Sequence, residues 1–298
     1  MTTRYGYLAM LVAMGLGWGS TQPLGKIAVS SGHRQFGLIF WQLVVGVVLL
    51  GAILILRRRR IPLTKATVAF AVLIVMIGTI IPNSAFYYSV AHLPSGIMSI
   101  LISTVPLMAF PVALMLRMDR FSMGRLVGLG CGLLGVALIA LPSASLPDAG
   151  MVAYLPIAMI GPLFYAFEGN YVARFGTAGM DAVQAMCLAS IVGVVIMLPV
   201  AIGSGQWIDL TQPWGMPEVA LIAGSVVHNL CYCAYVWLAA RAGAVFAAQT
   251  SYIVTGTGVI WAMLILGERF SGWVWAALCV MLLGLFLVQP RQNLENAA

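Results

Sequence analysis

Two ionisable side chains, Glu168 and His228, stand inside long apolar stretches of this 298-residue chain, in which only 8% of residues are charged. An ionised carboxylate within hydrocarbon is costly, so such a group usually faces a cavity and has a partner. Glu168 is thus a candidate to pair with a cationic group of a ligand or to carry a proton, with a structural, hydrogen-bonded carboxylate as the alternative. His228 is a second candidate proton carrier or ligand donor, because imidazole changes charge near neutral pH. A hydrogen-bonded packing role for His228 stays open.

Aromatic and amide side chains accompany these two positions at helical spacing. Tyr165 and Tyr171 lie three positions from Glu168, and Tyr232 lies four positions from His228, so each shares a helix face with its neighbour. Such groups suit a cationic or aromatic ligand, although each could instead join one helix to another. The candidate substrate-binding residues are Glu168, His228, Tyr232, Asn83, Tyr87, Trp41, Tyr165, Tyr171, Ser103, Gln249 and Tyr252. Gln42, beside Trp41, is a further residue that could reach a central cavity.

The elements that must position these residues are membrane spans. The chain is 62% hydrophobic and has a mean hydropathy of +1.02, whereas a soluble domain carries about 25% charged residues. Apolar stretches of about 20 residues, each long enough to cross the hydrocarbon core, recur along the whole length. We therefore expect an all-α integral membrane protein with ten transmembrane helices, near 5–27, 36–56, 67–90, 95–116, 124–141, 152–173, 183–203, 218–240, 244–266 and 273–288.

Charge placement predicts the orientation of these spans. If the N-terminus is cytoplasmic, every Lys and Arg except Lys26, Arg34 and Arg269 falls on the cytoplasmic side. The positive-inside rule therefore places both termini in the cytoplasm. We interpret the run Arg57–Arg60 as a topology anchor; the alternative is a patch for nucleic acid or anionic lipid. No nucleic-acid partner is expected.

Cysteine placement and missing motifs exclude several kinds of chemistry. All five cysteines lie in predicted spans, so a disulfide framework is not expected, and Cys231 and Cys233 point to different helix faces. No Gly-Lys-Ser/Thr phosphate loop is present, which argues against direct ATP drive. We expect no cofactor and no bound metal.

The chain also contains an internal repeat. Asp119-Arg120-Phe121-Ser122 returns 149 positions later as Glu268-Arg269-Phe270-Ser271. Each copy is expected to hold five spans, residues 1–146 and residues 147–298, which together form one transport domain. Because five is odd, the second copy lies inverted in the membrane. Inverted repeats are typical of secondary transporters, whose two halves can alternate about a site at the midplane.

Residues that destabilise a helix occur at corresponding places in the two halves and predict interrupted helices. The fourth span contains Pro106 and Pro111, and the ninth contains Gly256 and Gly258 at the corresponding place. Proline removes a backbone donor and glycine lowers helix stability. We expect a hinge or binding site at these four residues, with ordinary kinking of membrane helices as the alternative.

Two motifs resemble those of a known family. Trp18-Gly19-Ser20 with Pro23 and Lys26 in the first span, and Leu266-Gly267-Glu268-Arg269-Phe270-Ser271 before the last span, resemble the drug/metabolite transporter superfamily in its ten-helix EamA-type branch. The first half departs from the second motif, with Leu116-Arg117-Met118-Asp119-Arg120 in its place, which favours a loop-structuring role for the acidic position. The resemblance implies a ten-helix inverted-repeat fold and secondary transport of small metabolites. It also makes Lys26 a possible anion contact, beside our preferred interpretation that it snorkels to the interface.

These observations together predict a secondary transporter that works by alternating access, and not an enzyme. A membrane enzyme would need clustered catalytic or ligand side chains, and a channel would need rings of charges or carbonyls. We expect export of amino acids or related zwitterions across a bacterial inner membrane; the alternative is export of organic cations or lipophilic drugs, with or without coupling to protons. A glycine ridge at Gly124, Gly128 and Gly132 allows a monomer or a weak homodimer.

Overall fold

The computed structural model describes residues 2–118, 120–141, 145–242 and 249–288, and within these residues all regular structure is helical. Two of the helices begin directly after residues whose side chains cap them. The Thr64 side chain accepts a hydrogen bond from the Thr67 amide, and Asp181 does the same for Gln184, so each forms a capping box. The elements are α1 (Thr2–Ala28), α2 (Gln35–Leu56), α3 (Lys65–Val75), a π-helical turn (Met76–Ile80), α4 (Ile81–His92), α5 (Ser95–Ile102), α6 (Thr104–Met115), α7 (Met123–Ala140), a 3-10 turn (Ala149–Tyr154), α8 (Leu155–Phe175), α9 (Ala182–Gly203), α10 (Met216–Ala242), α12 (Thr250–Leu266) and α13 (Gly272–Val288).

These helices lie where the ten spans were predicted. Six helical segments are long and apolar enough to cross a membrane: Gln35–Leu56, Lys65–His92, Ser95–Met115, Met123–Ala140, Ala149–Phe175 and Ala182–Gly203. Helices α12 and α13 are apolar and shorter, and α1 and α10 have 27 residues each. The prediction of an all-α membrane protein is confirmed. Residues 142–144, 244–248 and Asp119, which belong to the predicted joint, ninth span and repeat motif, lie outside the described residues.

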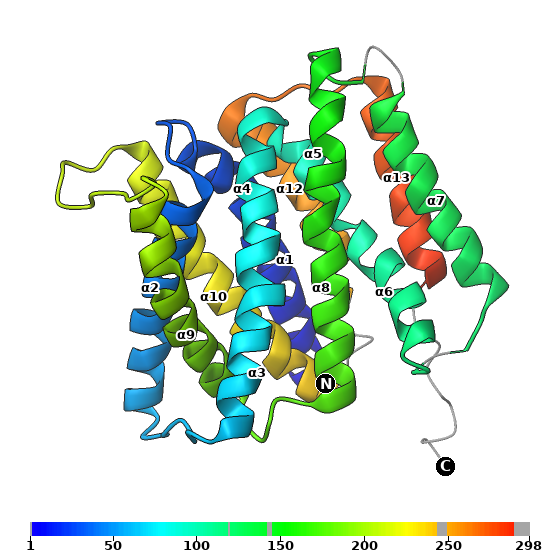
Figure 1. The fold of residues 1–298 in the computed structure, drawn as a ribbon. Helices are drawn as coiled ribbons and strands as arrows, with labels where there is room; N and C mark the ends of the chain where they lie inside the picture. Colours follow the sequence, from blue (N-terminus) through cyan, green and yellow to red (C-terminus); the bar gives the residue numbers. More distant parts are fainter. Residues whose placement is uncertain (1, 119, 142–144, 243–248, 289–298) are drawn as a thin grey trace.

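The two halves are inverted and interleaved. Helices α1 and α8, which begin the two halves, run in opposite directions (Figure 1). Helix α1 packs on α10 and α12 of the second half, and α8 packs correspondingly on α4 and α6 of the first. Further pairs between the halves are α2 with α9, α5 with α12 and α7 with α13. The tightest helix packing therefore joins one half to the other.

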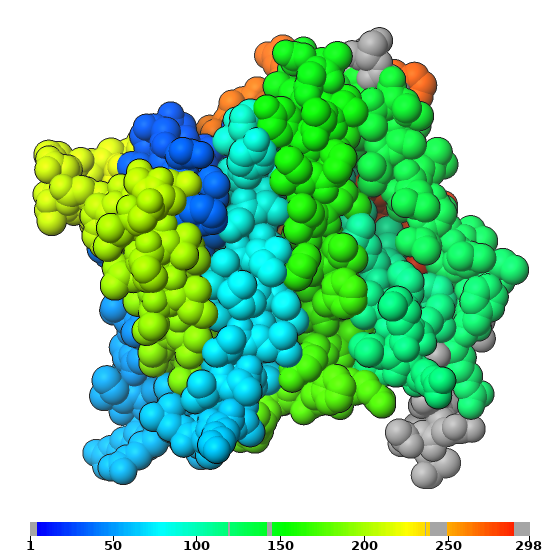
Figure 2. Space-filling view, in the orientation of Figure 1, coloured from blue at the N-terminus to red at the C-terminus, as the bar shows by residue number. Residues whose placement is uncertain are grey.

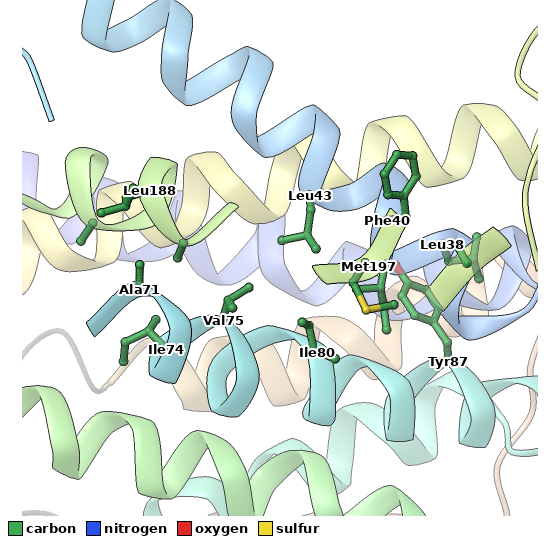
Figure 3. Close-up of a cluster of buried hydrophobic side chains, with 14 of the residues drawn as sticks. Leu38, Phe40, Leu43, Ala71, Ile74, Val75, Ile80, Tyr87, Leu188 and Met197 are labelled. Carbon is green, nitrogen blue, oxygen red and sulfur yellow. The ribbon is translucent and has the colours of Figure 1, made fainter. Parts of the chain in front are cut away.

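One large apolar core lies between α2, α3, α4 and α9. Leu43, Ile74 and Met197, which come from three different helices, are almost fully buried in it (Figure 3). On the face shown in Figure 2, α9, α3 with α4, and α8 stand side by side as columns. Apolar side chains such as Val195 and Ile202 are exposed, as expected for a surface that lipid covers.

The helix breaks differ from those that the sequence predicts. Span 4 is divided at Ser103 into α5 and α6, three residues before Pro106. In contrast, α12 continues without a break through Gly256 and Gly258, so the predicted interruption of the ninth span is wrong at these residues. Glycine weakens a helix but keeps its backbone donor, whereas proline removes one. Span 3, for which no break was predicted, contains the π-helical turn.

Glycines bring α7 close to its neighbours within the monomer. A Cβ at Gly128 would lie 2.7 Å from the Gly284 carbonyl oxygen of α13, and one at Gly132 would overlap Leu107 of α6. A Cβ at Gly124 would meet only Ser122, at 3.9 Å. Two of the three ridge glycines therefore serve packing inside the bundle.

Candidate substrate-binding site

A cavity of about 810 Å³ opens within the bundle, a volume typical of ligand pockets. Its walls come from both halves. The first half contributes α1, α2, the π-helical turn, α4, α5, α6 and α7, and the second contributes α8, α9, α10, α12 and α13. Apolar surface predominates, with a small number of polar groups among it. This is the composition expected of a site that binds small molecules.

Glu168 places a carboxylate in this cavity. Its side chain is 8% exposed, and its Oε1 accepts a hydrogen bond from the Tyr232 hydroxyl at 3.4 Å. The carboxyl group also lies directly against the backbone of Gly78, in the π-helical turn. No other hydrogen bond to this carboxylate is formed by the described residues. The group therefore keeps most of its capacity to accept hydrogen bonds.

A second polar group is a chain of hydrogen bonds between α2, α4 and α8. The Gln42 Oε1 accepts from Asn83 Nδ2 at 3.1 Å and from the Tyr87 hydroxyl at 3.2 Å. The Tyr165 hydroxyl donates to Asn83 Oδ1 at 3.0 Å. All four residues line the cavity. Because buried amides that bond one another resist rearrangement, the network gives this wall of the cavity a defined shape.

Aromatic rings form the wall around His228. The Trp18 ring lies 6.3 Å from the His228 ring, 6.5 Å from the Tyr232 ring and 5.7 Å from the Tyr235 ring, between centroids. All four line the cavity. Tyr232 belongs both to this cluster and to the hydrogen bond with Glu168, so π faces and a carboxylate are neighbours, an arrangement that suits a cation.

Two further groups at the cavity have clear chemical meaning. Arg125 of α7 is 9% exposed, lines the cavity, and places its guanidinium carbon 5.5 Å from the centre of the Phe110 ring. Gln22 and Thr250 also line the cavity, and the buried Gln22 Oε1 and Thr250 Oγ1 have no hydrogen-bond partner within the described part of the chain. Unpartnered buried polar atoms are unusual in proteins. They mark places where a ligand can supply the missing partner.

The structure brings most of the predicted binding residues together. Six line the cavity: Glu168, His228, Tyr232, Asn83, Tyr87 and Tyr165. Five others are not among its lining residues: Trp41, Tyr171, Ser103, Gln249 and Tyr252. Of the predicted hinge residues, Pro106 lines the cavity, and Pro111, Gly256 and Gly258 do not.

The residues away from the cavity have other contacts. Trp41 donates from Nε1 to the Ile208 carbonyl oxygen at 2.9 Å and packs on Trp207. Tyr171 lies against Phe70 and Phe175. The Ser103 hydroxyl donates to the Ile100 carbonyl oxygen at 2.7 Å, which satisfies it within its own helix turn.

Charged residues join the helices at the upper end of the bundle in Figure 1. The Lys26 ammonium donates to the carbonyl oxygens of Val90, Ala91 and Leu93 at 2.6–3.1 Å, at the end of α4. The Glu268 carboxylate accepts from the Ser95 and Gly96 amides at 2.7 and 3.0 Å, at the start of α5. Each charge compensates the helix end that it touches. Lys26 thus binds backbone and does not line the cavity.

Comparison with known proteins places this geometry in a family. The sequence profile of the EamA-like transporter family matches residues 4–141 and again residues 153–289. The chain belongs to the EamA-like transporter family. It is therefore a membrane transporter of small molecules, and its two matched segments are the two repeats of that family.

The fold of this EamA-like transporter also has a counterpart among solved structures. One, titled only "Crystal structure of protein", superposes with a TM-score of 0.65 at 13% sequence identity, covering 95% of this chain and 97% of the other. At that identity the likeness concerns the fold alone. No curated protein matches the chain. Among the described residues, no group of three or more His, Cys, Asp or Glu could hold a metal ion.

Some cavity residues of the transporter were not among the predicted binding residues. Of the adjacent pair that the sequence suggested could reach a cavity, Gln42 lines it and Trp41 does not, because neighbouring helix positions point about 100° apart. Arg125 was assigned to the cytoplasmic charge pattern, and Gly78 carries no polar signal. The available sequence signal for Arg125 was its position inside the predicted span 124–141.

Proposed function

We propose that this protein is a secondary transporter that exports amino acids or related zwitterions across a bacterial inner membrane, with both termini in the cytoplasm. The observation that carries the proposal is that an acid and a base, Glu168 and Arg125, line the same cavity. Both are nine-tenths or more buried. A zwitterion presents an ammonium and a carboxylate, and a cavity lined by side chains of both charges is complementary to it.

The polar groups between these charges support the same substrate class. Gln42 and Asn83 offer amide groups, and Gln22 and Thr250 offer oxygen atoms that lack partners. The predominantly apolar lining leaves room for a hydrophobic amino-acid side chain. The proposal therefore favours substrates with a polar head and an apolar body.

A second candidate is the transport of organic cations or lipophilic drugs, with or without coupling to protons. The observation that favours it is the aromatic cluster of Trp18, His228, Tyr232 and Tyr235 beside Glu168. Rings around a carboxylate attract a delocalised cation through both π faces and charge. On this alternative, Arg125 would contribute to structure only.

The proposed alternating access uses bodies that mix the two sequence halves. If each half moved rigidly, the close packing of α1 on α10 and α12, and of α7 on α13, would have to break. Close-packed interfaces resist such separation. We therefore revise the expectation that one sequence half tilts against the other. In the revised form, α1, α2, α9 and α10 move as one body relative to α6, α7 and α13, with Pro106 in α6 at the cavity wall.

The test is counterflow in proteoliposomes with radiolabelled amino acids and quaternary ammonium compounds. Exchange from preloaded vesicles needs no assumption about the driving ion. Saturable exchange of amino acids supports the proposal, and exchange of the quaternary cations alone supports the second candidate. A folded protein that exchanges neither class contradicts both substrate assignments.

The substitution Glu168→Gln separates two roles of the carboxylate. If Glu168 carries a coupling proton, transport driven by a pH gradient is lost while exchange continues. If it binds the substrate ammonium, the half-saturation concentration rises about tenfold or more at every pH, equivalent to about 1.4 kcal/mol. Wild-type behaviour in both assays contradicts both roles and leaves the carboxylate structural.

A further inference from the structure

The Glu168 carboxylate rests on an unusual piece of backbone. Residues Met76–Ile80 form a π-helical turn between α3 and α4, in which the Ile81 amide donates to the Met76 carbonyl oxygen five residues earlier. Turns of this kind are rare and frequently occur at functional sites. This turn also lies where span 3 changes neighbours, since α3 packs on α9 whereas α4 packs on α8 and α2.

A side chain at Gly78, at the centre of the turn, would displace the Glu168 carboxyl group. A Cβ at Gly78 would lie 2.5 Å from the Glu168 carboxyl carbon and 2.8 Å from Oε2, and it would overlap Oε1. Separations under 3 Å between a Cβ and another heavy atom essentially never occur, so the carboxyl group would have to move by roughly 1 Å. That displacement would carry Oε1 away from its hydrogen bond with Tyr232.

The other glycines that line the cavity have no such relation to a charged group. A Cβ at Gly161 would lie 3.6 Å from the Pro82 carbonyl oxygen, one at Gly224 would lie 3.5 Å from Leu24, and one at Gly169 would have nothing within 4 Å. One at Gly25 would meet the apolar ring of Phe86. The contact with a carboxylate distinguishes Gly78 from all of them.

We propose that Gly78 is a positioning residue for Glu168. Because Gly78 has no side chain, the Glu168 carboxylate can contact the backbone of the π-helical turn in span 3, and this contact directs the carboxylate toward Tyr232 and the cavity. The inference deepens the proposed function and rests on it for the transport readout. Gly78 does not touch substrate itself. It acts by fixing the position from which Glu168 meets a substrate ammonium or a proton.

The transport test compares a variant that displaces the Glu168 carboxylate with a double variant in which a shorter side chain removes the steric overlap. Gly78→Ala is expected to lower the counterflow rate about tenfold. The matched control is Gly51→Ala in α2, where an added Cβ would have nothing within 4 Å and which does not line the cavity; it is expected to change the rate less than about threefold. Glu168→Asp shortens the side chain by one methylene and withdraws the carboxyl group from an introduced methyl. The double variant Gly78→Ala/Glu168→Asp should therefore exceed Gly78→Ala alone.

Rescue by the double variant separates positioning from general damage. If Gly78→Ala exchanges substrate at the wild-type rate, or if the double variant is no better than Gly78→Ala, the inference is overturned. If Gly78→Ala fails to fold, the same comparison is made on the yield of monodisperse protein in detergent. Recovery of folded protein by Glu168→Asp then supports the inference, and absence of recovery overturns it.

A second readout does not depend on any substrate. Dicyclohexylcarbodiimide reacts with protonated carboxyl groups in apolar surroundings, and mass spectrometry reports the labelled fraction of Glu168 at each pH. Gly78→Ala should move the pH of half-labelling by about 0.5 unit or more, and Gly51→Ala should not. An unchanged labelling profile in Gly78→Ala overturns the inference. If the pH of half-labelling shifts in Gly78→Ala but the protein exchanges no tested substrate, the result supports the positioning role of Gly78 and contradicts the proposed substrate class.

Discussion

Gln22 has hydrogen-bonding capacity that the protein itself leaves unused. Its Oε1 is buried in the cavity wall without a partner, and an unpaired buried polar atom costs about 1–3 kcal/mol. Gln22→Met should therefore stabilise the empty protein by about 1 kcal/mol and raise the half-saturation concentration for substrate about tenfold. Thermal denaturation in detergent and the concentration dependence of counterflow measure the two effects. A less stable variant with unchanged half-saturation would show that Gln22 has a packing role only.

Gln42 and Trp41 are adjacent in sequence and differ in surroundings. Gln42 accepts hydrogen bonds from Asn83 and Tyr87 at the cavity, whereas Trp41 bonds the Ile208 carbonyl oxygen away from it. Gln42→Leu should raise the half-saturation concentration about tenfold, because it leaves two donors unpaired and reshapes the wall. Trp41→Phe, the neighbouring control, should change it less than about twofold. Equal effects of the two substitutions on counterflow would contradict the placement of the site.

At the scale of elements, Glu268 gives the repeat motif a physical role. Its carboxylate accepts three hydrogen bonds from Ser95 and Gly96, at the start of the eight-residue helix α5. Glu268→Gln removes the charge that compensates this helix end, so we expect a loss of about 1–3 kcal/mol of stability. Thermal denaturation in detergent checks this. The control is Asp209→Asn, whose hydrogen bonds stay within its own exposed loop; if both variants melt alike, the cap is not important.

The two halves also differ in backbone conformation where the helices before this motif end. Gly267 ends α12 with φ of 66°, and Arg117 takes the same left-handed conformation after α6, with φ of 55°. Glycine adopts this conformation without strain, whereas other residues do so at a cost of about 1–2 kcal/mol. The conformation recurs 150 positions apart, one more than the sequence motif, so the loop of the first half has a different register.

At the scale of the whole molecule, the interleaved halves predict which links between helices the transport cycle tolerates. A Cβ at Gly17 of α1 would lie 2.7 Å from Cys231 Sγ of α10, within reach of a disulfide. Because α1 and α10 belong to one proposed body, oxidation of Gly17→Cys should reduce counterflow less than about twofold. Thiol titration verifies the bond, and Gly17→Ser is the control. Loss of transport on oxidation, restored by a reductant, would instead favour motion of one sequence half against the other.

The prediction of spans from sequence succeeded because the surrounding lipid restricts the structures that an apolar stretch can adopt. Lipid cannot hydrogen-bond to backbone groups, so an apolar stretch of about 20 residues has to be helical. The bounds of α2 (Gln35–Leu56) and α9 (Ala182–Gly203) agree with prediction to within one residue. The π-helical turn was invisible because Met76–Ile80 is as apolar as the helix around it. The predicted break at Gly256 and Gly258 failed because glycine keeps its backbone donor, and at Gly258 α12 lies directly against Ser99 of α5 and Gly19 of α1.

The sequence by itself determined the class of protein, its spans, its inverted repeat and the one carboxylate deep within a span, since each depends on composition or on local periodicity. Only the tertiary structure decided which side chains share the cavity. It selected Gln42 and not Trp41, it placed Arg125 in the same cavity as Glu168, and it placed Gly78 against the carboxylate. Those relations depend on the rotation of each helix about its axis and on contacts between residues about 90 positions apart, such as Gly78 and Glu168. Packing between helices fixes both, and no local pattern encodes them.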